Sequence, residues 1–168
     1  MIRRILFFML LIALSSGIPQ LLPAGWAGPD LFLLTALVVA LRYSAVTGVF
    51  AGYGLGLLED LLGHGYFGLH ALGLAGAVLM FHSLDGFFNL APRLREGLGV
   101  VLAVVGQWLS FLILTYWLRN DLVTVQTLYT LFPLQMLFAL LLYLPWKALS
   151  RVFWGPLEDF SDFGERLR

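Results

Sequence analysis

The chain has 168 residues, of which 60% are hydrophobic and 12% charged, and it contains no cysteine. A soluble domain carries roughly 25% charged residues, so most of this surface cannot face water, and the composition indicates an all-α, polytopic membrane protein. The formal net charge of zero excludes the basic surface that binds nucleic acid, and the absence of cysteine excludes disulfides, thiolate nucleophiles and cysteine-ligated metals.

Apolar segments separated by turn residues follow one another along the chain. A hydrocarbon layer of about 30 Å needs about 20 helical residues to cross it. The six candidate spans are Ile5–Leu22, Pro29–Leu41, Ser44–Leu62, Tyr66–Leu84, Leu98–Leu118 and Leu128–Leu149. We therefore predict one integral membrane domain over residues 1–168, a six-helix bundle with a short cytoplasmic or interfacial tail from about residue 150.

The first span could also be interpreted as a cleavable signal peptide. Arg3 and Arg4 precede an apolar run, and small residues follow it around Ala24–Ala27. The run is longer than a usual signal core and the match to a cleavage site is loose, which favours an uncleaved first span. An intact mass that lacks the first two dozen or so residues would contradict this.

The second segment, Pro29–Leu41, is too short to cross as a straight helix. It begins earlier, near Trp26, or it is tilted or partly re-entrant. The positive-inside rule favours a crossing, because six spans with the N-terminus inside leave Arg119 as the only basic residue outside. The basic residues then inside are Arg3, Arg4, Arg42, Arg93, Arg95, Lys147, Arg151, Arg166 and Arg168. Both termini are accordingly expected in the cytoplasm.

The third segment carries small or polar residues at every fourth position. These are Ser44, Gly48, Gly52, Gly56 and Asp60, which fall on one helical face. Glycines at this spacing let another helix approach closely, as in GxxxG pairing. Two interpretations are open: packing against another helix of the same chain, or a docking face for a different membrane protein.

Two carboxylates, Glu59 and Asp60, end this segment near the predicted outer surface. Carboxylates at a helix C-terminus interact unfavourably with its dipole, and charges at membrane depth are costly. Asp60 therefore either organises the following glycine-rich turn or contacts a partner. His64 and His70 lie nearby, but their spacing matches no familiar ligand pattern, so we expect no metal.

Other polar residues of the spans predict contacts between helices. In the last two spans they are Gln107, Ser110, Thr115 and Gln135. We expect interhelical hydrogen bonds from them, in preference to a transport path. His82 and Asp85 are expected to form a polar cap at the inner end of the fourth span. Since the chain has no nucleophile elbow, phosphate-binding loop or paired carboxylates suited to acid–base work, we expect neither an enzyme nor a cofactor.

The stretch Gly56–Leu72 contains the run Gly-Leu-Leu-Glu-Asp-Leu-Leu and the restart Gly-Leu-His-Ala-Leu. It resembles the bacterial rod shape-determining protein MreD family, as do the preceding Ala40–Ser44 turn and the glycine-rich continuation Gly48–Gly54. Length and layout match over the whole chain, but the specific part covers Ala40–Leu72. The loop residues of the motif are Gly63, Gly68 and His70. Gly63 stands where family members often carry serine, so a capping hydroxyl is missing there.

This resemblance implies a non-enzymatic component of the machinery that synthesises peptidoglycan during cell elongation, in the bacterial cytoplasmic membrane. Its implied partners are MreC, which has one transmembrane helix, and then RodA, a class B penicillin-binding transpeptidase and MreB filaments, besides membrane lipids. The family is similar in fold to the substrate-binding subunits of energy-coupling-factor vitamin transporters.

Two functions follow for the site residues. The leading hypothesis is a scaffold that binds the transmembrane helix of MreC on the Ser44–Asp60 face. The alternative is a small-molecule, vitamin-like binding subunit of a transporter. Its site would be the outer cluster Glu59, Asp60, His64, Tyr66 and His70. A lipid-modifying or proteolytic enzyme is a third and weaker hypothesis.

Overall fold

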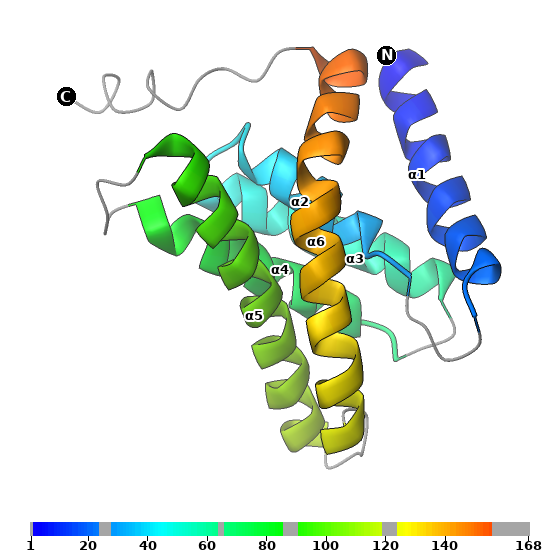
Figure 1. Cartoon of the computed structure of the whole chain (residues 1–168), viewed down its shortest axis with the longest axis vertical. Coiled ribbons are helices and arrows are strands. Elements are labelled where there is room, and N and C mark those ends of the chain that lie inside the picture. The colour runs from blue at the N-terminus through cyan, green and yellow to red at the C-terminus, as the bar shows by residue number, and fades with distance from the viewer. Residues whose placement is uncertain (1, 24–27, 64–65, 86–90, 119–123, 156–168) are drawn as a thin grey trace.

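A computed structural model describes residues 2–23, 28–63, 66–85, 91–118 and 124–155. Six α-helices and one short 3₁₀ helix make up the described chain. They are α1 (Ile2–Leu21), α2 (Leu31–Ala40), α3 (Ala45–Leu62), α4 (Leu69–His82), η1 (Ser83–Asp85), α5 (Pro92–Leu118) and α6 (Val125–Trp154). Figure 1 shows α5 and α6 as a long hairpin that extends beyond the other helices, with α1 on the other side of α6. The predicted all-α class is confirmed.

Four helices are long and apolar enough to cross a membrane. They are α1, α3, α5 and α6, and at 1.5 Å per residue α6 measures about 45 Å. This is the length and composition expected of a membrane protein. The two others are shorter: α2 has 10 residues and α4 has 14, about 15 and 21 Å. Six crossings therefore stay a prediction of the charge rule.

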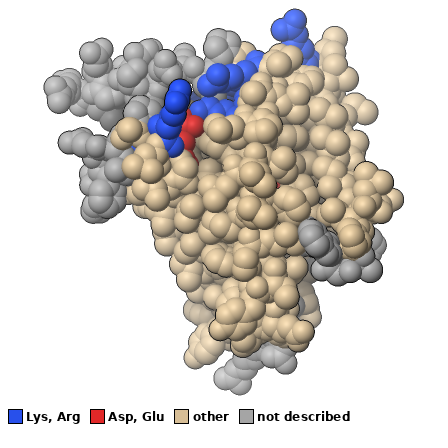
Figure 2. Space-filling model, viewed as in Figure 1, with Lys and Arg blue, Asp and Glu red and all other residues tan. Residues whose placement is uncertain are grey.

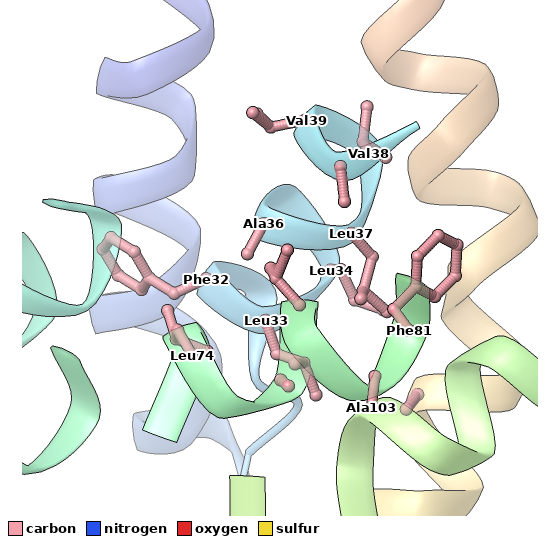
Figure 3. Close-up of a cluster of buried hydrophobic side chains, with 14 of the residues drawn as sticks. Phe32, Leu33, Leu34, Ala36, Leu37, Val38, Val39, Leu74, Phe81 and Ala103 are labelled. Carbon is pink, nitrogen blue, oxygen red and sulfur yellow. The ribbon is translucent and has the colours of Figure 1, made fainter. Parts of the chain in front are cut away.

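Helix α2 forms the centre of the bundle. An earlier start near Trp26 is wrong, because α2 begins directly after Asp30, whose Oδ1 accepts a hydrogen bond of 2.7 Å from the Leu33 amide. All ten residues of α2 are buried, and it packs against α1, α3, α4 and α6. Figure 3 shows its side chains pointing in several directions into one cluster with Leu74, Phe81 and Ala103. A helix that is apolar all round is the kind a protein buries completely.

The last two helices are longer than predicted. Helix α5 begins at Pro92 and not at Leu98, and α6 runs from Val125 to Trp154. The prediction counted only the apolar run, whereas both helices continue into polar turns at their ends. Proline is favoured in the first helical turn because its missing N–H would have no partner there, which explains the start at Pro92.

Charged side chains gather where α1 begins and α6 ends, as Figures 1 and 2 show together. We call this the basic end. It includes an ion pair between Lys147 Nζ of α6 and Glu96 Oε2 of α5, 2.6 Å apart. It also includes Arg4, Arg42 and Arg151, which lie close enough to affect one another electrostatically. The charge that the chain does carry is therefore concentrated at one end of the bundle on the face that Figure 2 shows.

Candidate functional site

The glycine face of α3 is covered by α4. A Cβ atom added at Gly52 would lie 3.1 Å from the Val78 side chain and 3.2 Å from the Leu74 carbonyl oxygen. One added at Gly56 would approach the backbone of His70 and Ala71 to less than 3.0 Å. The face therefore has no room for a helix of another protein. It packs against α4 of the same chain, which is the first of the two interpretations.

Gly48 and Ser44, at the N-terminal end of this face, differ from each other. Gly48 lies against Val78 and His82 of α4, like the other glycines. Ser44 is exposed, and its hydroxyl lies 3.1 Å from that of Thr47. The central residues of the predicted docking face are thus covered by α4, so a binding site for MreC has to lie on a different surface.

Asp60 joins the end of α3 to the start of α4. Its Oδ2 accepts hydrogen bonds from the backbone amides of Gly68 (2.8 Å) and Ala71 (3.3 Å). Its Oδ1 accepts one from the amide of His70 (3.1 Å) and lies 2.8 Å from His70 Nδ1. The Asp60 side chain is 1% exposed. We call this arrangement the Asp60–His70 joint.

The joint explains a carboxylate at an otherwise unfavourable position. The first amides of a helix have no partner inside that helix, and its N-terminus carries a partial positive charge. Asp60 satisfies these amides for α4 from the end of α3, so the carboxylate is stabilised by the next helix. Two roles were open for Asp60. The hydrogen bonds in the structure are those expected if Asp60 organises the turn between α3 and α4. Gly68 precedes α4 with φ +95°, a conformation that glycine adopts readily.

The other residues of the outer cluster are less closely connected. Glu59 Oε1 lies 4.0 Å from His70 Nε2, and Glu59 Oε2 is buried without a hydrogen-bond partner. Tyr66 is exposed, and His64 lies outside the described residues. Gly63 ends α3 with φ −89°, so its backbone does not require glycine. Within the described chain, no three His, Cys, Asp or Glu side chains group in a way that could hold a metal ion.

A second polar cluster lies inside the bundle, where α2 starts. Asp30 Oδ2 accepts hydrogen bonds from Gln107 Nε2 (2.7 Å) and Gln135 Nε2 (3.3 Å). Gln135 Nε2 also donates to Gln107 Oε1 (2.7 Å), and Gln135 Oε1 accepts one from the Trp108 indole (2.7 Å). We call these four residues the Asp30 network. It connects α5 and α6 to the N-terminus of α2.

The predicted interhelical hydrogen bonds are confirmed for Gln107 and Gln135 and wrong for the two hydroxyls. Ser110 donates to the Gly106 carbonyl and Thr115 to the Phe111 carbonyl, both in α5 itself. A hydroxyl is short enough to reach the carbonyl four residues earlier, whereas a glutamine side chain reaches a neighbouring helix. Asp30 itself was missed, although Asp directly before an apolar run is a typical N-cap signal.

The expected cap at the inner end of α4 is described only in part. His82 is half-buried, and its ring is 5.8 Å from that of Phe81. The side chain of Asp85 lies outside the described part of the chain, so the pairing of these two residues stays a prediction.

Replacing Gln135 by leucine is expected to destabilise the protein by about 2 kcal/mol. The change leaves the Trp108 indole and the Gln107 carbonyl oxygen without their partner in an apolar interior. Thermal unfolding of the purified protein in detergent measures the effect. Gln126→Leu is the matched control, because Gln126 is exposed on the same helix and its replacement should leave the midpoint unchanged. Equal midpoints for the two variants would contradict a stabilising role of the network.

Comparisons with protein-family models, with curated proteins and with solved structures find no match to this chain.

Proposed function

We propose that this chain is an MreD-family scaffold of the bacterial cell-elongation machinery. It lies in the cytoplasmic membrane, crosses it six times with both termini inside, and performs no catalysis. It binds MreC through packing of transmembrane helices, and with MreC it associates with RodA, a class B penicillin-binding transpeptidase and MreB filaments. Its bundle is similar to the substrate-binding subunits of energy-coupling-factor transporters.

The Asp60–His70 joint is the observation that carries this proposal. The Gly56–Leu72 stretch belongs to the specific part of the resemblance, and two of its polar residues, Asp60 and His70, contact each other and the start of α4. These contacts fix the end of α3 against the start of α4. Rigid presentation of a surface is what a scaffold requires. The same contacts engage Asp60 and Nδ1 of His70, which favours the scaffold over the vitamin-binding alternative.

The outward side of α3 is the surface that we assign to MreC. Since α4 covers the glycine side, the side chains on the other side of the helix point away from the bundle. Val46, Phe50 and Leu61 are 68%, 72% and 69% exposed. We call these three residues the outer α3 face. A single transmembrane helix can pack there without displacing α4, and association in lipid depends on such close packing.

Replacing Phe50 and Leu61 together by alanine is expected to reduce co-purification with MreC at least tenfold. The two substitutions remove packing area from the outer α3 face and leave every buried residue in place. The measurement is the amount of MreC from the same genome that is retained on the tagged protein after co-expression and detergent extraction.

A matched control uses α6, where Leu141 and Leu144 are 62% and 65% exposed. Their double replacement by alanine removes a similar apolar area from a different side of the bundle and should leave MreC binding intact. If the α3 and α6 variants retain equal amounts of MreC, the outer α3 face is not the docking surface. If the unaltered protein retains no MreC, the scaffold proposal itself is wrong.

A further inference from the structure

A cavity of about 440 Å³ lies between α1 and α3 near the basic end. Its apolar wall includes Phe8 of α1 together with Leu55 and Leu58 of α3. Helix α1 packs mainly on α2 and α6, whereas α3 packs mainly on α2 and α4. The two helices that form the walls of the cavity are therefore not closely packed against each other.

Positive charge and aromatic rings line the same cavity. Arg4, Arg42, Tyr43 and Trp154 belong to its lining, and none of the described lining residues is acidic. The Arg42 guanidinium donates a hydrogen bond of 2.8 Å to the Gly155 carbonyl and lies 5.6 Å from the centre of the Trp154 ring. These contacts hold one cation at a fixed place at the mouth of an apolar cavity.

The electrostatic surroundings of Arg42 favour an anion. Burial lowers the pKa of the Arg42 guanidinium, and the positive charges of Arg151 and Arg4 act in the same direction, while Tyr43 opposes them. The charges of Arg151 and Arg4 therefore act on Arg42. A phosphate beside Arg4 and Arg42, the two arginines of the cavity lining, would accept the charge-assisted hydrogen bonds that guanidinium groups form well with phosphate oxygens.

We propose that this cavity binds an anionic phospholipid from the surrounding bilayer, with the phosphate at Arg4 and Arg42 and one acyl chain along Phe8, Leu55 and Leu58. The cavity volume falls in the range of small-molecule sites, roughly 300–1,000 Å³. Tryptophan and tyrosine prefer the headgroup layer of a membrane, which is the depth that this placement gives to Trp154 and Tyr43. Basic pockets between helices are known to bind the headgroups of anionic lipids.

Other occupants fit the cavity less well. A free phosphate would contact the arginines and leave the apolar wall empty, and an uncharged apolar molecule would contact the wall and form no charge-assisted hydrogen bond with the arginines. A phospholipid uses both parts, and its second chain extends into the bilayer through the opening between α1 and α3.

The test measures lipid retained by the full-length protein in native mass spectrometry. The protein is exchanged into detergent micelles that contain phosphatidylglycerol or phosphatidylcholine with identical acyl chains. We expect one phosphatidylglycerol per chain, retained at least tenfold better than phosphatidylcholine. The double variant with Arg4→Gln and Arg42→Gln should lose this preference. Its control, Arg93→Gln with Arg95→Gln, removes the same charge from the start of α5 and should keep it.

A second pair of variants tests the apolar part without changing charge. Gly54 lines the cavity, and a Cβ atom there would meet nothing within 4 Å, so Gly54→Leu fills space without a backbone clash. Gly17 of α1 is equally open and lies outside the cavity lining, which makes Gly17→Leu the matched control. We expect Gly54→Leu to reduce phosphatidylglycerol retention at least tenfold and Gly17→Leu to leave it unchanged. Thermal unfolding midpoints equal to that of the unaltered protein show that both variants fold.

Three results would overturn the proposal. They are equal retention of the two lipids, phosphatidylglycerol retained unchanged by the Arg4 and Arg42 double variant, and displacement of the lipid by millimolar inorganic phosphate, which would assign the site to free phosphate. None of these measurements involves MreC, so the lipid site and the scaffold function fail or succeed separately.

Discussion

Replacing Gly56 by alanine is expected to destabilise the protein by about 3 kcal/mol, the upper range for overpacking of a tightly packed core. The added methyl group would meet the backbone of His70 and Ala71, and a backbone cannot turn away as a flexible side chain can. The helices α3 and α4 would have to separate, which also disturbs the contacts of Asp60. The thermal unfolding midpoint in detergent should fall, together with the yield of monodisperse protein.

Gly54 provides the matched control on the same helix. It faces away from α4, with open space around it. Alanine is a better helix former than glycine by about 1 kcal/mol, so Gly54→Ala should leave stability unchanged or raise it slightly. A fall of similar size for both variants would mean that the glycines act through backbone conformation and not through contact with α4.

Replacing Asp60 by asparagine is expected to destabilise the protein by about 3 kcal/mol, because a buried N–H that loses its acceptor costs about 1–3 kcal/mol. Asparagine retains one acceptor oxygen and presents an NH₂ group where the second oxygen was. At least one of the three amides that start α4 then faces a donor. Hydrogen exchange at Gly68, His70 and Ala71 should become faster, and the unfolding midpoint should fall.

The neighbouring carboxylate separates this effect from a general loss of negative charge. Glu59→Gln makes the same chemical change one residue earlier, where Oε2 has no hydrogen-bond partner. Neutralising a buried and poorly paired carboxylate removes a desolvation cost, so its stability should stay the same or increase. If Glu59→Gln and Asp60→Asn are equally destabilising, the hydrogen bonds to α4 do not account for the role of Asp60.

Local sequence patterns were enough to predict most of the helices. The apolar runs predict α1, α3, α5 and α6 because a span of lipid requires a continuous apolar segment. The four-residue spacing of Gly48, Gly52 and Gly56 correctly indicated a surface of close helix approach. The spacing could not indicate which helix packs on this surface, because close approach of α4 and close approach of a helix from another protein both require small residues there.

Contacts between distant residues could be predicted only in part. Organisation of the following turn was one of the two roles predicted for Asp60, but the three backbone amides that it binds, 8 to 11 residues later, were not identified. The cavity at the basic end combines residues from both ends of the chain, Arg4 and Trp154. Counting basic residues predicts on which side of the membrane they lie, but it does not predict that they line the same cavity.

The Asp30 network also has a consequence for the biogenesis of the protein. Asp30 is 77 residues before Gln107 and 105 before Gln135, so α5 must be synthesised before the first of these bonds can form and α6 before the second. Until α6 emerges, the Asp30 carboxylate can accept hydrogen bonds from the Leu33 amide and from Gln107 but not from Gln135. Helices that enter the lipid separately and associate afterwards pass through such a stage. The order of synthesis therefore makes α6 the element that completes the network, and a nascent chain that stalls before α6 leaves Gln107 and Trp108 without their partner Gln135.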